Sequence, residues 1–123
     1  MPKNILVLAG SPRLQGNSDM LADAFIEGAR LNGNVVSKVN VSRYKINGCV
    51  DCQYCFSHEG KCVHRDGMDE IYPLLEAAEV LVFATPVYFF GFSSQLKCVI
   101  DRFYAKALVG HHVSQCALLA VGA

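Results

Sequence analysis

Residues 5–18 read ILVLAGSPRLQGNS, and this stretch decides the fold. Five consecutive apolar residues predict a strand that is covered on both faces. The breaker Gly10-Ser11-Pro12 ends the strand, and Asn17 or Ser18 is a suitable cap for a helix. Apolar residues then recur at three- and four-residue spacing as far as Asn32-Gly33-Asn34, which ends that helix. The stretch therefore predicts a strand, a loop and a helix in succession.

The same alternation continues along the chain. Further elements are predicted, in order, as an exposed edge strand at Val35–Val41, a helix from about Asp69 that carries Pro73, a second buried strand at Val80–Ala84, a helix capped by Ser93 or Ser94, and a third buried strand at Cys116–Val121. Strands that alternate with helices predict a parallel, doubly wound sheet in a three-layer α/β/α arrangement. Ligands of such sheets bind beyond the carboxyl ends of the strands. The loops that follow the buried strands are therefore the candidate site.

The chain stops at Ala123, directly after the third buried strand. A final strand and two helices would be expected to complete such a domain. An uncovered apolar strand would offer a bare edge that invites pairing with another chain. We therefore expect either a domain that is incomplete at its C-terminus or an oligomer that covers the edge.

The composition excludes several classes of function. The 123 residues suit one domain, 1–123, and eleven basic residues balance eleven acidic ones. No basic stripe favours nucleic acid, and no cationic amphipathic segment favours a membrane surface. The longest apolar runs fall far short of the about 20 residues that a membrane span needs. We expect a cytoplasmic protein that binds neither nucleic acid nor membrane.

The loop after the first strand has the features of a phosphate site. A phosphate would accept hydrogen bonds from the unpaired amides of the helix start, and the helix dipole favours its charge. Hydroxyl, amide and guanidinium donors are added by Ser11, Ser18, Asn17 and Arg13, and Gly16 allows close approach. The loop is not GxGxxG and lacks the lysine of GxxxxGK[ST], which disfavours a dinucleotide or a nucleoside triphosphate. The alternative is a polar turn with a helix cap.

The loop after the second buried strand, Thr85–Phe92, holds four aromatic residues. Large apolar rings are costly to leave in water, and a flat tricyclic ring would shield them. We expect Phe92 to fold back onto the core. Tyr88 and Phe89 are assigned to a ligand or to a subunit interface.

Four of the six cysteines lie in a loop at about 44–66, spaced Cys49-x2-Cys52-x2-Cys55-x6-Cys62. This spacing lets a tight loop direct several thiolates to one centre, as in ferredoxin-type clusters. Structural zinc is the first alternative, and free or oxidised cysteines are the second. His58 and His64 are expected to be solvated loop residues. Cys98 and Cys116 are expected to be small buried hydrophobic residues.

Three segments in register resemble the flavodoxin-like NAD(P)H-dependent FMN reductase superfamily, namely Gly10–Ser18, Thr85–Tyr88 and Gln95–Arg102. The cysteine spacing is similar to that of its iron–sulfur flavoprotein group. The resemblance implies a flavodoxin-like fold in which the FMN phosphate is held by Ser11, Arg13, Asn17 and Ser18. It implies that the isoalloxazine is lined by Pro86, Val87, Tyr88, Phe89 and Gly91. A third flavin loop of the family follows the final strand and is mostly missing from this chain.

The same resemblance implies that Cys49, Cys52, Cys55 and Cys62 hold a 4Fe–4S cluster near the FMN of a partner subunit. The predicted function is an FMN-dependent oxidoreductase of the NAD(P)H-dependent FMN or quinone reductase type. Its electrons would come from NAD(P)H or a ferredoxin-like donor and could be relayed through the cluster. We assign no catalytic side chain and expect a homo-oligomer, a dimer or a tetramer.

Two alternatives to this function stay open. One is a non-enzymatic electron carrier, since the sequence offers no clear nicotinamide site. The other is a zinc-binding structural or regulatory protein on the same scaffold.

Overall fold

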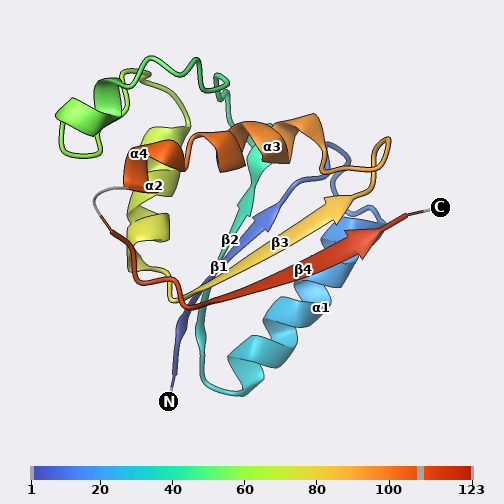
Figure 1. Ribbon diagram of the computed structural model, residues 1–123. Coiled ribbons are helices and arrows are strands. Elements are labelled where there is room, and N and C mark those ends of the chain that lie inside the picture. Colours follow the sequence, from blue (N-terminus) through green and yellow to red (C-terminus); the bar gives the residue numbers. More distant parts are fainter. Residues whose placement is uncertain (1, 108–109, 123) are drawn as a thin grey trace.

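The computed structural model describes residues 2–107 and 110–122. A parallel sheet in the order β2-β1-β3-β4 forms its centre (Figure 1), with the strands β1 (Asn4–Ala9), β2 (Val35–Asn40), β3 (Val80–Pro86) and β4 (Gln115–Val121). The helix α1 (Asn17–Leu31) covers one face. The other face is covered by α2 (Met68–Ala77), α3 (Ser94–Asp101) and the short α4 (Tyr104–Ala107). The predicted α/β class with helices on both faces is confirmed.

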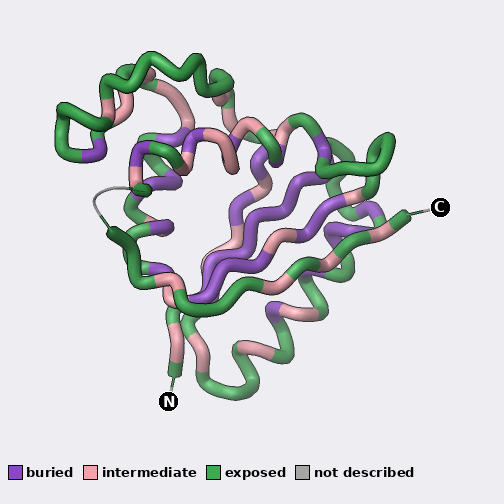
Figure 2. Tube along the Cα trace, in the orientation of Figure 1, coloured by how far each residue is buried: buried purple, intermediate pink, exposed green. Residues whose placement is uncertain are grey.

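The two central strands form the core, as their apolar runs predict. Successive side chains of a strand point to opposite faces, so Leu6 and Leu8 pack against α2 and α3, while Ile5 and Val7 pack against α1. Figure 2 shows that burial is concentrated along β1 and β3. Residues Val35–Asn40 form an edge strand, also as predicted.

The prediction that the last strand is buried is wrong. β4 forms the other edge of the sheet in the described structure, and its Leu118 is 57% exposed. Ala117 and Leu119 pack against the cluster beneath α1, but no described helix lies over the opposite face (Figures 1 and 2). Cys116 is therefore exposed rather than buried. Cys98 is only half-buried, because it lies on the flank of α3 while Leu96 and Val99 face the core.

The helix starts follow three different patterns. Ser93 caps α3 through its side chain, one of the two predicted caps. Asp66 accepts a hydrogen bond from the amide of Met68 at 3.0 Å, so α2 begins at Met68 and runs through Pro73. The predicted cap of α1 is wrong, because Gly16 is its N-cap and no side chain among the described residues caps it. The first turn of α1 is therefore open.

The described residues also include no helix that combines the length and the apolar character needed to cross a bilayer.

We predict that Ser93→Ala destabilises the fold by about 1–3 kcal/mol. The buried Ser93 hydroxyl donates to the carbonyl of Gly10 at 2.6 Å and accepts from the amide of Leu96 at 3.3 Å, so it joins two loops to one helix start. The exposed neighbour Ser94 is the matched control, and Ser94→Ala should change stability by less than about 0.5 kcal/mol. Urea unfolding measures both. Equal effects of the two substitutions would contradict the role of Ser93.

Candidate functional site

The two predicted ligand loops lie side by side at the carboxyl edge of the sheet (Figure 1). The amide of Gly10 donates to the carbonyl of Ala84 at 2.7 Å, and the Ser93 hydroxyl donates to Gly10 from the other side. A Cβ on Gly10 would lie 2.8 Å from the Cβ of Leu96, closer than side chains pack. Only glycine fits here, and this close approach fixes the loop after β1 against the loop after β3.

The loop after β1 folds around its own polar groups. The Ser11 hydroxyl accepts from the amide of Arg13 at 3.1 Å and donates to its carbonyl at 3.0 Å. A Cβ on Gly16 would meet the Nε of Arg13 at 3.0 Å, so the guanidinium lies beside the residue that precedes α1. Ser11 and Ser18 are both buried. An open helix start with a cation beside it suits an anionic group.

A carboxylate that the sequence reasoning did not single out lies beneath this loop. Asp19 accepts from the amide of Gln15 at 2.9 Å and from the Nζ of Lys38 at 2.6 Å. Burial alone would raise the pKa of Asp19, but the bonds from Lys38 and Gln15 outweigh burial and lower it. The ion pair offsets a negative charge that would otherwise repel an anion at the helix start. The position of Asp19 in the first turn of α1 is the sequence signal that could have identified this residue.

The loop after β3 is a tight hairpin. Tyr88 and Gly91 exchange two backbone hydrogen bonds of 3.0 and 3.1 Å, so Phe89 and Phe90 form the turn. Both have positive φ, 46° and 69°, as in turns that favour Asn-Gly. Left-handed backbone costs a residue with a side chain about 1–3 kcal/mol.

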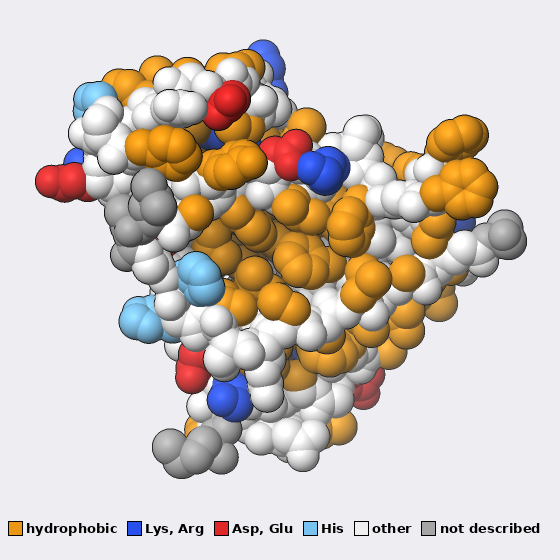
Figure 3. Space-filling view, in the orientation of Figure 1, with side chains coloured by type: hydrophobic (Ala, Val, Ile, Leu, Met, Phe, Trp, Pro, Cys, Tyr) orange, Lys and Arg blue, Asp and Glu red, His pale blue; other side chains and the backbone are white. Residues whose placement is uncertain are grey.

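The two rings at this turn are 95% and 93% exposed and meet edge to face, with centroids 5.4 Å apart. Phe92 lies beside Phe83, with ring centroids 6.3 Å apart, but it is 38% exposed and belongs to neither core cluster, so the prediction that it folds back onto the core is met only in part. Figure 3 shows apolar side chains over the hollow between α3 and β4. The part of this hollow beside the hairpin is lined by Thr85, Val87, Phe90, Gly91, Phe92, Leu118 and Ala120. Strain and exposure coincide at the hairpin tip, next to an apolar surface.

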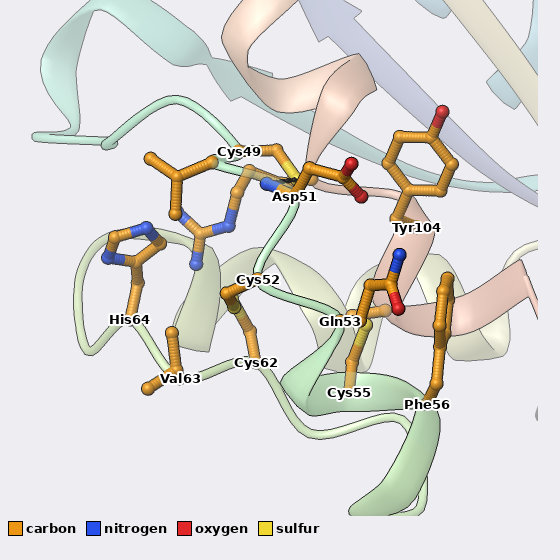
Figure 4. A pocket seen from close by; sticks show the side chains of 13 residues that line it. Cys49, Asp51, Cys52, Gln53, Cys55, Phe56, Cys62, Val63, His64 and Tyr104 are labelled. Atoms are coloured by element: carbon orange, nitrogen blue, oxygen red, sulfur yellow. Dashed lines mark hydrogen bonds between the residues drawn. The ribbon is translucent and has the colours of Figure 1, made fainter.

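The four clustered cysteines line one pocket (Figure 4), together with residues that include His64, Arg102 and Tyr104. Non-glycine residues with positive φ, Asp51, Gln53 and Glu59, turn the loop back on itself. Burial raises the pKa of Cys55, and the charges of the other three thiols raise it further. All six cysteines are free. Within the described residues, no three metal-ligating side chains are close enough to form a metal centre, so ligation by these cysteines stays a prediction.

Arg102, which lines this pocket, forms a buried ion pair with Asp66. The Nη1 of Arg102 donates to Asp66 at 2.6 Å and to the carbonyl of Asn47 at 2.9 Å. The two side chains are only 1% and 4% exposed. Burial alone would raise the pKa of Asp66, but hydrogen bonds from Arg102 and from the amides of Asn47 and Met68 hold it below its usual value. Sequence reasoning missed this pair, because its members are far apart in the chain.

The two loop histidines behave differently. His58 is exposed and stacks on Tyr54 with ring centroids 3.6 Å apart, which is consistent with the predicted surface position. For His64 the prediction of a solvated side chain is wrong, since its Nε2 is buried and the residue lines the cysteine pocket. The loop folds back over His64, and the spacing of the cysteines gave no sign of this.

The parallel sheet and the two loops locked at its carboxyl edge define a flavodoxin-like α/β protein. The chain belongs to the NADPH-dependent FMN reductase family, whose model matches residues 3–123, and this family binds FMN. The resemblance to the FMN reductase superfamily is therefore confirmed.

The relatives include iron–sulfur flavoproteins of two archaea. One from Archaeoglobus fulgidus is 40% identical over 95 residues, which are 77% of this chain and 43% of the relative. One from Methanocaldococcus jannaschii is 38% identical over 95 residues, which are 77% of this chain and 48% of the relative. The chain thus spans about half the length of the curated relatives it matches.

Among solved structures, an NAD(P)H:quinone oxidoreductase from Methanothermobacter marburgensis aligns with a TM-score of 0.77 at 17% identity. The alignment covers 99% of this chain and 66% of the other. At this identity the likeness concerns the fold, and it confirms the flavodoxin-like class.

We predict that Asp66→Asn destabilises the protein by about 3–5 kcal/mol at neutral pH, because Arg102 is left buried without its counter-charge. The pKa of Asp66 in the folded state lies below its usual value of 3.8, so its contribution is complete above about pH 5 and is lost as the pH falls through 3.8 and lower. The difference between wild type and variant should therefore shrink towards pH 3. Urea unfolding at several pH values measures this difference in the free energy of unfolding. The more exposed Asp69 is the control, and Asp69→Asn with the same pH profile as Asp66→Asn would contradict the assignment.

Proposed function

We propose that the protein is an FMN-dependent oxidoreductase that takes electrons from NAD(P)H. The observation that carries the proposal is the start of α1, which no side chain caps among the described residues and which lies beside Arg13 and Gly16. The chain also belongs to a family that binds FMN. When bound, FMN supplies the hydride- and electron-transfer chemistry. The residues of the chain then have to bind, orient and shield it.

The phosphate would be bound at the loop after β1. The amides of the first turn of α1 and the side chains of Ser11, Arg13, Asn17 and Ser18 supply its donors. The ion pair between Asp19 and Lys38 supports this role, because it offsets the negative charge of Asp19 beneath the loop, and the second carboxylate on Lys38, Asp23, lies further along α1 and is exposed.

The ring would lie against the loop after β3. Five residues are proposed to line it and exclude water, namely Pro86, Val87, Tyr88, Phe89 and Gly91. The amide of Val87 donates to the carbonyl of Val121 at 2.8 Å, which holds this segment in extension of the sheet. Aromatic faces beside an apolar hollow suit a flat heterocycle.

The cysteine pocket would hold a 4Fe–4S cluster through Cys49, Cys52, Cys55 and Cys62. Thiolates are the ligands that such clusters prefer, and all four thiols of this pocket are free. The names of the archaeal relatives support iron–sulfur rather than zinc. The buried, unpartnered polar atoms beside these thiols also suit a charged occupant. Zinc, which four thiolates also satisfy, is the alternative.

The electron donor is proposed from the family, whose description names NADPH. A ferredoxin-like donor to a non-enzymatic carrier is the alternative, and rapid-mixing reduction by NADPH or by reduced ferredoxin separates the two. Six free thiols in a short chain fit the reducing conditions of the cytoplasm, where we propose that the protein acts.

A homo-oligomer is part of the proposal. The exposed face of β4, the exposed hairpin tip and the protruding cysteine loop present apolar surface that a second copy of the chain would cover. The strained turn supports this role, since a tight turn with no contact to make would favour other residues.

We predict that Arg13→Gln weakens FMN binding about ten- to a hundred-fold, because a charge-assisted bond to phosphate is worth about 1.5–3 kcal/mol. Riboflavin has no phosphate, so its binding should not change. Titration monitored by the quenching of flavin fluorescence measures both ligands. An equal loss for the two flavins would contradict the phosphate role of Arg13, and a wild-type protein that binds no FMN at saturation would contradict the proposed function.

We predict that replacing the turn by Phe89→Asn and Phe90→Gly abolishes self-association and raises the stability of the subunit, because Asn-Gly suits a turn of this type. Light scattering should give a mass above 13.4 kDa for the wild type and about 13.4 kDa for the variant. Leu31→Ser, at an exposed position at the far end of α1, is the control and should leave the mass unchanged. A monomeric wild type would contradict the proposal.

A further inference from the structure

The guanidinium of Arg102 is only partly used by the contacts described above. Both of its bonds, to Asp66 and to the carbonyl of Asn47, come from Nη1. The Nε and Nη2 atoms are buried and have no partner among the described residues. A buried donor left unpaired costs about 1–3 kcal/mol, so a side chain that is 99% buried is expected to use these atoms.

The unused atoms share one edge of the guanidinium. This is the edge with which arginine forms two parallel hydrogen bonds to an anion. Asp66 and Asn47 bind the opposite corner and so leave this edge free. Arg102 lines the cysteine pocket, and so does His64, whose Nε2 is also buried and without a partner among the described residues. Three polar atoms beside the four thiols thus lack partners.

The charge of this pocket agrees with an anionic occupant. Four thiolates around a cationic metal core keep a net negative charge, and a buried charge needs a counter-charge and hydrogen bonds. Asp51 is the carboxylate that lines the pocket, and it is exposed to solvent, where water satisfies it. Among the residues that line this pocket, the permanent positive charge is that of Arg102, which Asp66 holds in place.

The geometry points to Arg102 as a positioning residue of the metal centre, donating hydrogen bonds through Nε and Nη2 to the thiolate sulfurs of the cysteine pocket and offsetting their charge. This role rests on the proposed metal centre. Hydrogen bonds to cluster sulfurs raise the reduction potential, because they stabilise the more negative, reduced state. Arg102 would therefore set the potential without ligating the metal. His64 Nε2 is the second donor available to the same sulfurs.

Arg102→Lys tests this role, since lysine keeps the positive charge beside Asp66 but lacks the two parallel N–H donors that Nε and Nη2 provide. The double variant Asp66→Asn with Arg102→Gln replaces the whole ion pair by a neutral pair, in case the single variant does not fold. Arg65→Lys, on an exposed side chain of the same loop, is the control. The proteins are loaded anaerobically with ferrous iron and sulfide, their iron and sulfide are assayed, and their folding is checked by circular dichroism. The midpoint potential of the cluster is then measured by a titration monitored by electron paramagnetic resonance.

At a fixed potential, we expect the ratio of reduced to oxidised cluster to be about ten-fold lower in the folded Arg102 variants than in the wild type. For a one-electron couple this is a fall of about 59 mV. The control should keep the wild-type potential. Unchanged potentials in folded, loaded variants would overturn the role of Arg102 and leave the cluster proposal standing.

A wild type that binds zinc but no iron and sulfide would overturn the cluster proposal alone. Arg102 would then be expected to stabilise the zinc thiolate, with about ten-fold weaker zinc binding in its variants, and unchanged zinc affinity would overturn the role. A wild type that binds neither metal would overturn both proposals.

Discussion

The buried ion pair between Asp66 and Arg102 is the interaction on which the arrangement of the cysteine loop, α2 and α3 depends. Asp66 ends the cysteine-rich loop and accepts from the amide of Met68, the first residue of α2, and Arg102 follows the last residue of α3. One guanidinium nitrogen reaches both this carboxylate and the carbonyl of Asn47, so it joins both ends of the loop to two helices. Such a pair adds little net stability, since the cost of removing the charges from water offsets their attraction. Its effect is to fix geometry, because any shift would leave a charge buried and unpaired.

The carboxyl edge of the sheet combines rigid and strained parts. The Ser93 hydroxyl and the close contact of Gly10 with α3 hold the two predicted ligand loops together. A few residues further along, Phe89 and Phe90 are held in left-handed backbone and exposed to water. Backbone strain is tolerated where the surrounding structure is firm. The contacts of Gly10 and Ser93 therefore explain how the hairpin can keep Phe89 and Phe90 in a strained, exposed turn.

Local pattern was enough to predict the central part of the fold. The apolar runs of β1 and β3, the Ser93 cap and the edge position of β2 follow from neighbours in sequence and from strand periodicity. The exposure of β4 could not be predicted this way, because an apolar strand is buried only if other elements cover it. The family resemblance, not periodicity, directed attention to the two ligand loops.

The details of the site depend on contacts between distant residues. Arg102 meets Asp66 across 36 positions of the chain, and the Nε2 of His64 is buried because its loop folds back. The turn at Phe89-Phe90 has none of the residues that usually mark such a turn.

Hydrogen bonds join the two ends of the loop that holds the cysteines, while Cys55 and Cys62 inside the loop pack against the core. The amide of Gly67 donates to the carbonyl of Lys45 at 2.9 Å, and Asp66 accepts from the amide of Asn47 at 3.0 Å, so its ends are joined independently of what lies between them. The entropy of closing a loop grows slowly, by about 0.6 kcal/mol for each doubling of its length. The exposed part of the loop can therefore change in length at little entropic cost, whereas Cys55 and Cys62 are held against the core. Insertions and deletions are therefore expected in the exposed segments of this loop, where they leave the sheet unchanged.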